Sequence, residues 1–138
     1  MPILFRTGSF LLLLVVAGCG SPSRSEPVAR LQGNVTINGR PLPADAAGSV
    51  TFKSRERGQA PPATAKIKDG GYQTDRAPLG DVTAIFHINR PTGKIVKDSP
   101  TDAHPHPELQ DLVPEELHDG VPANVTGDNP HLDFDLRD

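Results

Sequence analysis

The stretch RLQGNVTIN at residues 30–38 alternates between two kinds of side chain, and this alternation decides the fold class. A period of two residues is typical of a β-strand that buries one face and exposes the other. The inward positions are Leu31, Gly33, Val35 and Ile37, and the residues between them are polar. Asn38-Gly39 follows, and because both residues tolerate positive φ, the pair predicts a tight turn. A second turn is predicted at Asp69-Gly70-Gly71.

The same alternation recurs in short segments along the rest of the chain. The segments are SVTFK (49–53), ATAKIK (63–68), GDVTAIFHIN (80–89), PANVT (122–126) and HLDFDL (131–136). The large side chains expected in the core are Phe52, Tyr72, Phe86 and Phe134. Six or seven short strands separated by Gly, Pro, Asn and Asp predict an all-β fold, a small antiparallel β-sandwich. One helical turn is expected in PEELH, residues 114–118.

Residues 90–120 depart from the alternation. They contain five prolines and little periodic apolar sequence. We therefore expect a long Pro-rich loop here, and a loop of this length inside a compact domain is commonly functional or disordered.

The amino-terminal residues have the features of a signal peptide. A continuous apolar run from Phe10 to Ala17 follows the single positive charge of Arg6, and it is too short to span a bilayer. The run ends at Val16-Ala17-Gly18-Cys19, and Cys19 is the chain's one cysteine, so an internal disulfide is excluded.

These four residues resemble the lipobox of bacterial lipoproteins. The resemblance implies cleavage before Cys19, diacylglycerol on its sulfur and acylation of the new amino terminus. It divides the chain into a lipoprotein signal peptide (1–18), a lipidated flexible tether (19–30) and a β-sandwich domain (31–138). The expected location is the bacterial cell envelope, with the protein anchored in a membrane and facing the periplasm or the cell exterior. The alternatives are an ordinary signal peptide with an unmodified cysteine and an uncleaved segment that belongs to the core.

Three longer blocks carry a second resemblance. LQGNVTINGRPLPADAAGSVTF (31–52) and AKIKDGGYQTDRAPLGDVTAIFHI (65–88) resemble carboxypeptidase-regulatory-like, or transthyretin-like, sandwich domains. VPEELHDGVPANVTGDNPHLDFDL (113–136) is similar to the tail of small lipoproteins of planctomycete-type bacteria. The resemblance implies the same sandwich fold.

Charge and motifs restrict the possible functions. The formal net charge is −3 with no basic cluster, which argues against nucleic-acid binding. The chain has no nucleophile elbow, zinc-binding helix motif or phosphate loop. We therefore expect a non-catalytic envelope lipoprotein without a cofactor, in a binding, structural or accessory role. Its partner would be an envelope protein or a glycan, contacted through the 90–120 loop or a free strand edge.

Two groups of residues keep other chemistries open. His104 and His106, with Glu108 and Asp102 nearby, could bind Zn²⁺ or Cu²⁺, and His87 or His118 could complete such a site. The alternative is that prolines hold this stretch extended as a polar linker. Asp133 and Asp135 share one face of the last segment, so they are either an acid–base pair or a solvated outer face.

Overall fold

The computed structural model describes residues 27–57 and 60–138. The predicted cleavage and lipid attachment at Cys19, and most of the predicted tether, lie outside these residues. Within them the chain forms nine strands and one short helical turn, so the all-β class is confirmed. No helix in the described part is long and apolar enough to cross a membrane. The elements are β1 (Val28–Ile37), β2 (Arg40–Pro41), β3 (Ala47–Ser54), β4 (Ala63–Lys68), β5 (Gly71–Pro78), β6 (Gly80–Val96), β7 (His106–Asp111), the 3₁₀ turn η1 (Glu115–Leu117), β8 (Val121–Val125) and β9 (Phe134–Leu136).

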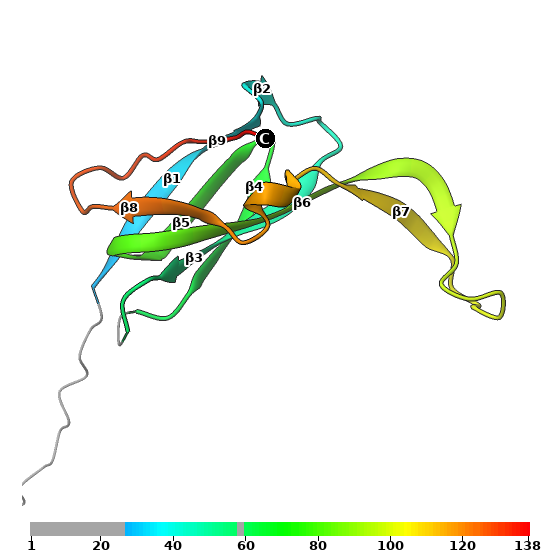
Figure 1. Cartoon of the computed structure of the whole chain (residues 1–138), viewed down its shortest axis with the longest axis horizontal. Coiled ribbons are helices and arrows are strands. Elements are labelled where there is room, and N and C mark those ends of the chain that lie inside the picture. Colours follow the sequence, from blue (N-terminus) through cyan, green and yellow to red (C-terminus); the bar gives the residue numbers. More distant parts are fainter. Residues whose placement is uncertain (1–26, 58–59) are drawn as a thin grey trace, which may run out of the picture.

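The strands form one curled sheet in the order β2-β1-β5-β4-β3-β6-β7 (Figure 1). β8 pairs with β6, and β9 pairs with β1. Most neighbours are antiparallel, as predicted, but β1 and β9 run parallel. The longest regular ladder joins β3 to β6, from Ala47 opposite Asn89 to Ser54 opposite Val82.

Both predicted two-residue turns are confirmed. Asn38 and Gly39 have φ of 51° and 73°, and Asp69 and Gly70 have φ of 51° and 76°. Two consecutive residues with positive φ give the hairpin turn whose twist matches that of the flanking strands. These turns connect β1 to β2 and β4 to β5.

Most side chains of the core are ones that the alternation placed inward, and Val113, from the predicted 90–120 loop, also belongs to the core. The four aromatic residues expected in the core are all buried. The ring of Phe134 lies 6.2 Å from Phe52, 6.1 Å from Tyr72 and 5.1 Å from Phe86, between ring centroids. Because these partners come from β3, β5 and β6, the short carboxyl-terminal strand β9 joins the aromatic packing of three other strands.

The carboxyl-terminal segment passes closely over β1 at Gly33. A Cβ atom at Gly33 would lie 1.9 Å from the carbonyl oxygen of Leu132, so only glycine leaves room for this crossing. The backbone N–H of Gln32 donates to the Pro130 carbonyl at 2.8 Å, and that of Leu132 donates to the Gln32 carbonyl at 2.9 Å. The Tyr72 hydroxyl also donates to the Leu132 carbonyl. The beginning and the end of the described chain are thus held together by hydrogen bonds.

Two sequence-based boundaries are corrected. β1 begins at Val28, which lies opposite Pro78 of β5, so the folded part starts three residues before the predicted start of the domain at Leu31. Residues 90–120 are not one long loop, because β6 continues to Val96 and pairs with β7. Proline is tolerated in such a strand when its missing N–H would face outward. The helical turn expected in PEELH is confirmed as η1.

The second half of β6 and β7 form a two-stranded ribbon, here called the arm: residues 90–96, the connection 97–105 and residues 106–111. Figure 1 shows the arm extending away from the rest of the sheet, at the end opposite the start of β1. The ladder between β3 and β6 stops at Asn89, so no other strand of the described chain pairs with the arm.

Candidate functional site

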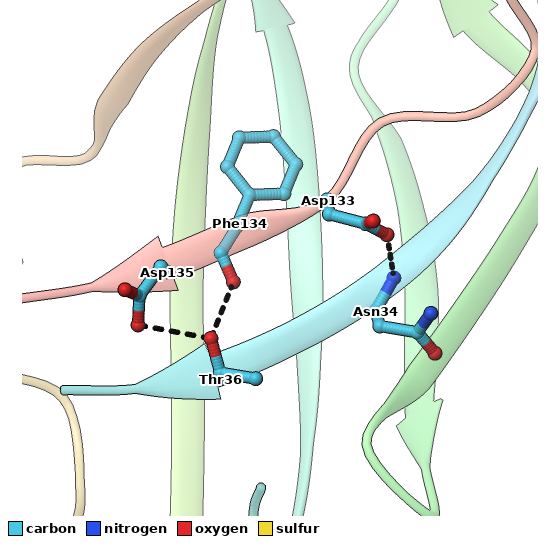
Figure 2. Close-up of a pocket in the computed structure, with 5 residues that line it drawn as sticks. All are labelled: Asn34, Thr36, Asp133, Phe134 and Asp135. Atoms are coloured by element: carbon cyan, nitrogen blue, oxygen red, sulfur yellow. Dashed lines mark hydrogen bonds between the residues drawn. The ribbon is translucent and has the colours of Figure 1, made fainter. Parts of the chain in front are cut away.

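The first candidate site is a shallow pocket of about 260 Å³ where β9 lies along β1 (Figure 2). It is lined by Asn34, Thr36, Asp133, Phe134 and Asp135. Both carboxylates lie outward, as the alternation predicts, and both turn toward β1. Asp133 accepts a hydrogen bond from the backbone N–H of Asn34 at 2.7 Å. Asp135 accepts one from the Thr36 hydroxyl at 2.9 Å.

Further donors complete the environment of the two aspartates. The backbone N–H of Gly39 donates to Asp135 at 2.8 Å, and Arg137 forms an ion pair with the same carboxylate. His131 Nε2 lies 2.9 Å from Asp133. The pKa of Asp133 is lowered chiefly by the Asn34 N–H, and the pKa of Asp135 chiefly by the Gly39 N–H. Both groups are therefore ionised at neutral pH.

This arrangement favours a structural role for the two aspartates. A glycosidase-type pair needs one carboxyl group with a raised pKa to act as the general acid. Here the pKa values of both aspartates are lowered. Each carboxylate accepts hydrogen bonds from β1 or from the turn that follows β1. The two side chains thus fasten β9 to β1, a role that neither sequence-based alternative included.

The predicted metal ligands lie in the arm and do not converge. His106 and Glu108 share one face of β7, but each has another partner. His106 Nε2 lies 3.0 Å from the Asp98 carboxylate, and the Thr92 hydroxyl donates to Glu108 at 2.6 Å. The hydrogen bond with Asp98 raises the pKa of His106.

The other proposed ligands do not complete a metal site with His106 and Glu108 in the described chain. The backbone N–H of His104 donates to the Asp102 carboxylate at 2.8 Å. His87 is exposed on the outer face of β6, and His118 contacts Asp111 at 3.4 Å. Across residues 27–57 and 60–138, no three His, Cys, Asp or Glu side chains are grouped so that they could hold a metal ion.

The arm has two chemically different faces. Side chains directly opposite one another in a ladder, and those two residues apart in a strand, share a face. Pro91 lies opposite Leu109, and Ile95 lies opposite Pro107, so these four apolar residues form one face. Ile95 is 66% exposed and Leu109 59% exposed. In the described chain, the only other large apolar side chain classed as exposed is that of Val28.

The opposite face of the arm is polar and internally hydrogen-bonded. Arg90 Nε donates to the Gln110 side chain at 3.2 Å, next to the contacts made by Glu108 and His106. Side chains of the polar face therefore hydrogen-bond to one another within the arm, whereas Ile95 and Leu109 on the apolar face are exposed in the described part of the chain. We call the face formed by Pro91, Ile95, Pro107 and Leu109 the apolar face of the arm.

Comparison of this chain with protein-family models, with curated proteins and with solved structures found no match. Sequence reasoning missed the apolar face because it assigned residues 90–120 to a loop. A signal was present, since the apolar residues Pro107 and Leu109 are two residues apart, but short runs broken by proline do not indicate a ladder.

Proposed function

We propose that the protein is a lipid-anchored, non-catalytic lipoprotein of the bacterial envelope that acts by binding through its arm. The observation that carries the proposal is the position and surface of the arm. It extends from the end of the sheet opposite the start of β1 (Figure 1). It also exposes two large apolar side chains, Ile95 and Leu109, on one face. Contiguous exposed apolar surface of this kind is typical of interaction sites.

The lipid anchor rests on the residues that precede the described chain. Val16-Ala17-Gly18-Cys19 matches the lipobox, and two or three acyl chains anchor a protein durably where one does not. The eight residues between Cys19 and Val28 could span up to about 30 Å when extended. A domain held in this way at the start of β1 would carry its arm at the far end, available to a partner.

The finer fold that we propose is the transthyretin-like, or carboxypeptidase-regulatory-like, β-sandwich. Its support is the series of short antiparallel strands, the two glycine-containing hairpin turns and the carboxyl-terminal strand that packs onto the aromatic core. A module of this type binds through loops and edges on a rigid sheet. The lowered pKa values of Asp133 and Asp135 support a non-catalytic role, because neither group is held ready to donate a proton.

Fractionation of bacterial cells that express the full chain tests the anchor. The wild-type protein should sediment with membranes and remain there in high salt, because a covalent lipid is insensitive to ionic strength. The Cys19→Ser variant should lose this durable attachment, and a Ser25→Ala variant in the same segment serves as the matched control. Equal membrane retention of wild type and Cys19→Ser would contradict the proposal.

A further inference from the structure

We propose that the outer face of β3 and β4 binds a linear acidic polysaccharide along a row of four cationic side chains. The row consists of Lys68, Lys66, Lys53 and Arg55, and we call it the cationic row. All four side chains are exposed, and none forms an ion pair within residues 27–57 and 60–138. The row uses neither the arm nor the lipid anchor, so this inference goes beyond the proposed function and can fail independently of it.

The row forms because two neighbouring strands present alternate residues on the same face. Burial alternates strictly along β4, and its exposed positions include Lys66 and Lys68. Lys53 is exposed in β3 directly after a buried position. The backbone N–H of Arg55 donates to the Asp81 carbonyl at 3.0 Å, which continues the ladder between β3 and β6 and keeps Arg55 on the face of Lys53. Neither β3 nor β4 contains Asp or Glu.

The strand register places the cations in one line along the seam between β3 and β4. Thr64 lies opposite Thr51, and this pair occupies the middle of the row. Lys66 lies two residues from Thr64 on one side, and Lys53 lies two residues from Thr51 on the other. Two residues of a strand span about 7 Å, so the four steps of the row cover about 27 Å. Such a line faces the repeated charges of a linear polyanion more fully than it faces one small anion.

Shallow hollows flank the row on both sides. The hollow on the β5 side has a volume of about 390 Å³ and is lined by the two lysines of β4 and by Gln73. The hollow on the β6 side has a volume of about 400 Å³ and is lined by Lys53, Arg55 and Thr83, among others. Each hollow thus combines two cations with a neutral hydrogen-bonding side chain. This combination suits a sugar unit that carries both a carboxylate and hydroxyl groups.

Three acidic residues border the row and limit its attraction for anions. Asp69 and Glu56 follow the last residue at each end of the row, and Asp119 lines the hollow on the β6 side. The middle of the row, at Lys66 and Lys53, lies between these acidic residues. We therefore expect weak binding that is carried by the middle of the row and strengthened by the repeats of a polymer.

The neutral groups of the face favour a polysaccharide among linear polyanions. The hydroxyl oxygens of Thr51 and Thr64 lie 2.9 Å apart, and each hydroxyl can form a further hydrogen bond, for which sugar hydroxyls are suitable partners. A single-stranded nucleic acid binds partly by stacking its bases on exposed aromatic rings. Every aromatic side chain in the described chain is buried, so this face offers no such ring.

The same face lacks the apolar side chains that insert into a lipid surface. The exposed large apolar residues of the described chain are Val28, Ile95 and Leu109, and none of them belongs to β3 or β4. Peripheral membrane surfaces combine cations with apolar side chains that enter the headgroup region. A row of cations and hydroxyls without apolar residues is better matched by a hydrated polymer.

Binding of the full chain to an acidic and a neutral polysaccharide tests the inference. The full chain, extracted from membranes in a nonionic detergent, is applied to immobilised sodium alginate and to immobilised dextran in buffer without divalent cations. Alginate should retain the protein at low ionic strength and release it in about 1 M NaCl, where charges are screened beyond about 3 Å. Dextran should not retain it. A protein that passes through alginate at low ionic strength would overturn the inference.

Charge reversal in the middle of the row tests its location. Lys53→Glu combined with Lys66→Glu should weaken alginate binding at least about tenfold, because each change replaces an attraction with a repulsion. Lys94→Glu combined with Lys97→Glu is the matched control, since it changes the net charge equally at the arm, and it should weaken binding less than about threefold. Equal weakening by the two double variants would overturn the inference. Circular dichroism checks that each variant keeps its strand content.

Removal of the two hydroxyl groups tests the choice of a polysaccharide. Thr51→Val combined with Thr64→Val keeps the shape of both side chains and should weaken alginate binding about threefold or more. Binding to polyphosphate, a linear polyanion without hydroxyl groups along its chain, should not change. Alginate binding that is unaffected by the two valines would contradict the polysaccharide assignment. Tighter binding to polyphosphate, single-stranded DNA or anionic lipid vesicles than to alginate would contradict it as well.

Discussion

Replacing Gly33 with alanine should destabilise the fold, although the same change in an unobstructed strand would stabilise it. The new methyl group would lie 1.9 Å from the Leu132 carbonyl oxygen, 2.6 Å from its carbonyl carbon and 3.1 Å from the Tyr72 hydroxyl. The nearest atoms belong to the backbone, so no side-chain rotation relieves the contact. The segment that crosses β1 must move by about 1 Å or more to reach an ordinary contact distance.

The expected cost follows from the contacts that this movement disturbs. Overpacking costs about 1–3 kcal/mol. The two backbone hydrogen bonds of Gln32 and the hydroxyl bond of Tyr72 contribute about 0.5–1.5 kcal/mol each and would be weakened. Alanine offsets about 0.4–1 kcal/mol of this cost, because it lowers the conformational entropy of the unfolded chain. The net loss in the free energy of unfolding is about 2–4 kcal/mol.

Urea unfolding followed by far-ultraviolet circular dichroism measures this loss. With a denaturant slope of about 1–3 kcal/mol/M, the midpoint should fall by about 1–3 M. Gly127→Ala is the matched control, because a Cβ there meets nothing within 4 Å, and it should change stability by less than about 0.5 kcal/mol. A Gly33→Ala protein as stable as the wild type would refute the close approach of the carboxyl-terminal segment to β1.

Three further predictions concern the last strand and the arm. Phe134→Ala should lower the free energy of unfolding by about 3–5 kcal/mol, because it removes the ring that contacts three other aromatic side chains; a loss below about 1 kcal/mol in urea unfolding would contradict this packing. The lowered pKa values of Asp133 and Asp135 mean that their ionised forms stabilise the fold above the unfolded pKa near 4, and that this stability is lost as the pH falls through the folded pKa values. Asp135→Asn should therefore reduce the loss of stability on acidification, and an unchanged acid slope would refute the contribution of that side chain. Titration with Zn²⁺ should show no binding tighter than about 10 μM that depends on His104 and His106. Tighter binding that is abolished by His104→Ala and His106→Ala would contradict this expectation and support the metal hypothesis.

Local features of the fold could be predicted because they depend on neighbouring residues. The alternation in GDVTAIFHIN predicted the buried face of β6 as far as Ile88. The four residues that it places inward are all buried: Val82, Ala84, Phe86 and Ile88. Asn38-Gly39 and Asp69-Gly70 predicted their turns because few other residue pairs adopt positive φ at consecutive positions. The segment HLDFDL was expected to form a strand with Phe134 inward, and its last three residues form β9 with Phe134 buried.

Features that depend on distant residues could not be predicted in this way. The extension of β6 beyond Asn89 exists because β7 pairs with it, and the prolines of both strands suggested a loop when each segment was considered alone. Asp133 and Asp135 were assigned to an acid–base pair or a solvated face, since the sequence does not show that β9 lies parallel to β1. The role of Gly33 likewise follows from a segment about a hundred residues away.

The amino terminus of the mature protein provides the most direct test of the account's central claim, that this domain is tethered to a membrane by lipid. Mass spectrometry of the full chain expressed in bacteria and extracted from their membranes should show a protein that begins at Cys19 and carries the added mass of its acyl chains. A mature protein that begins at another residue, or that begins at Cys19 with a free thiol, would contradict the account.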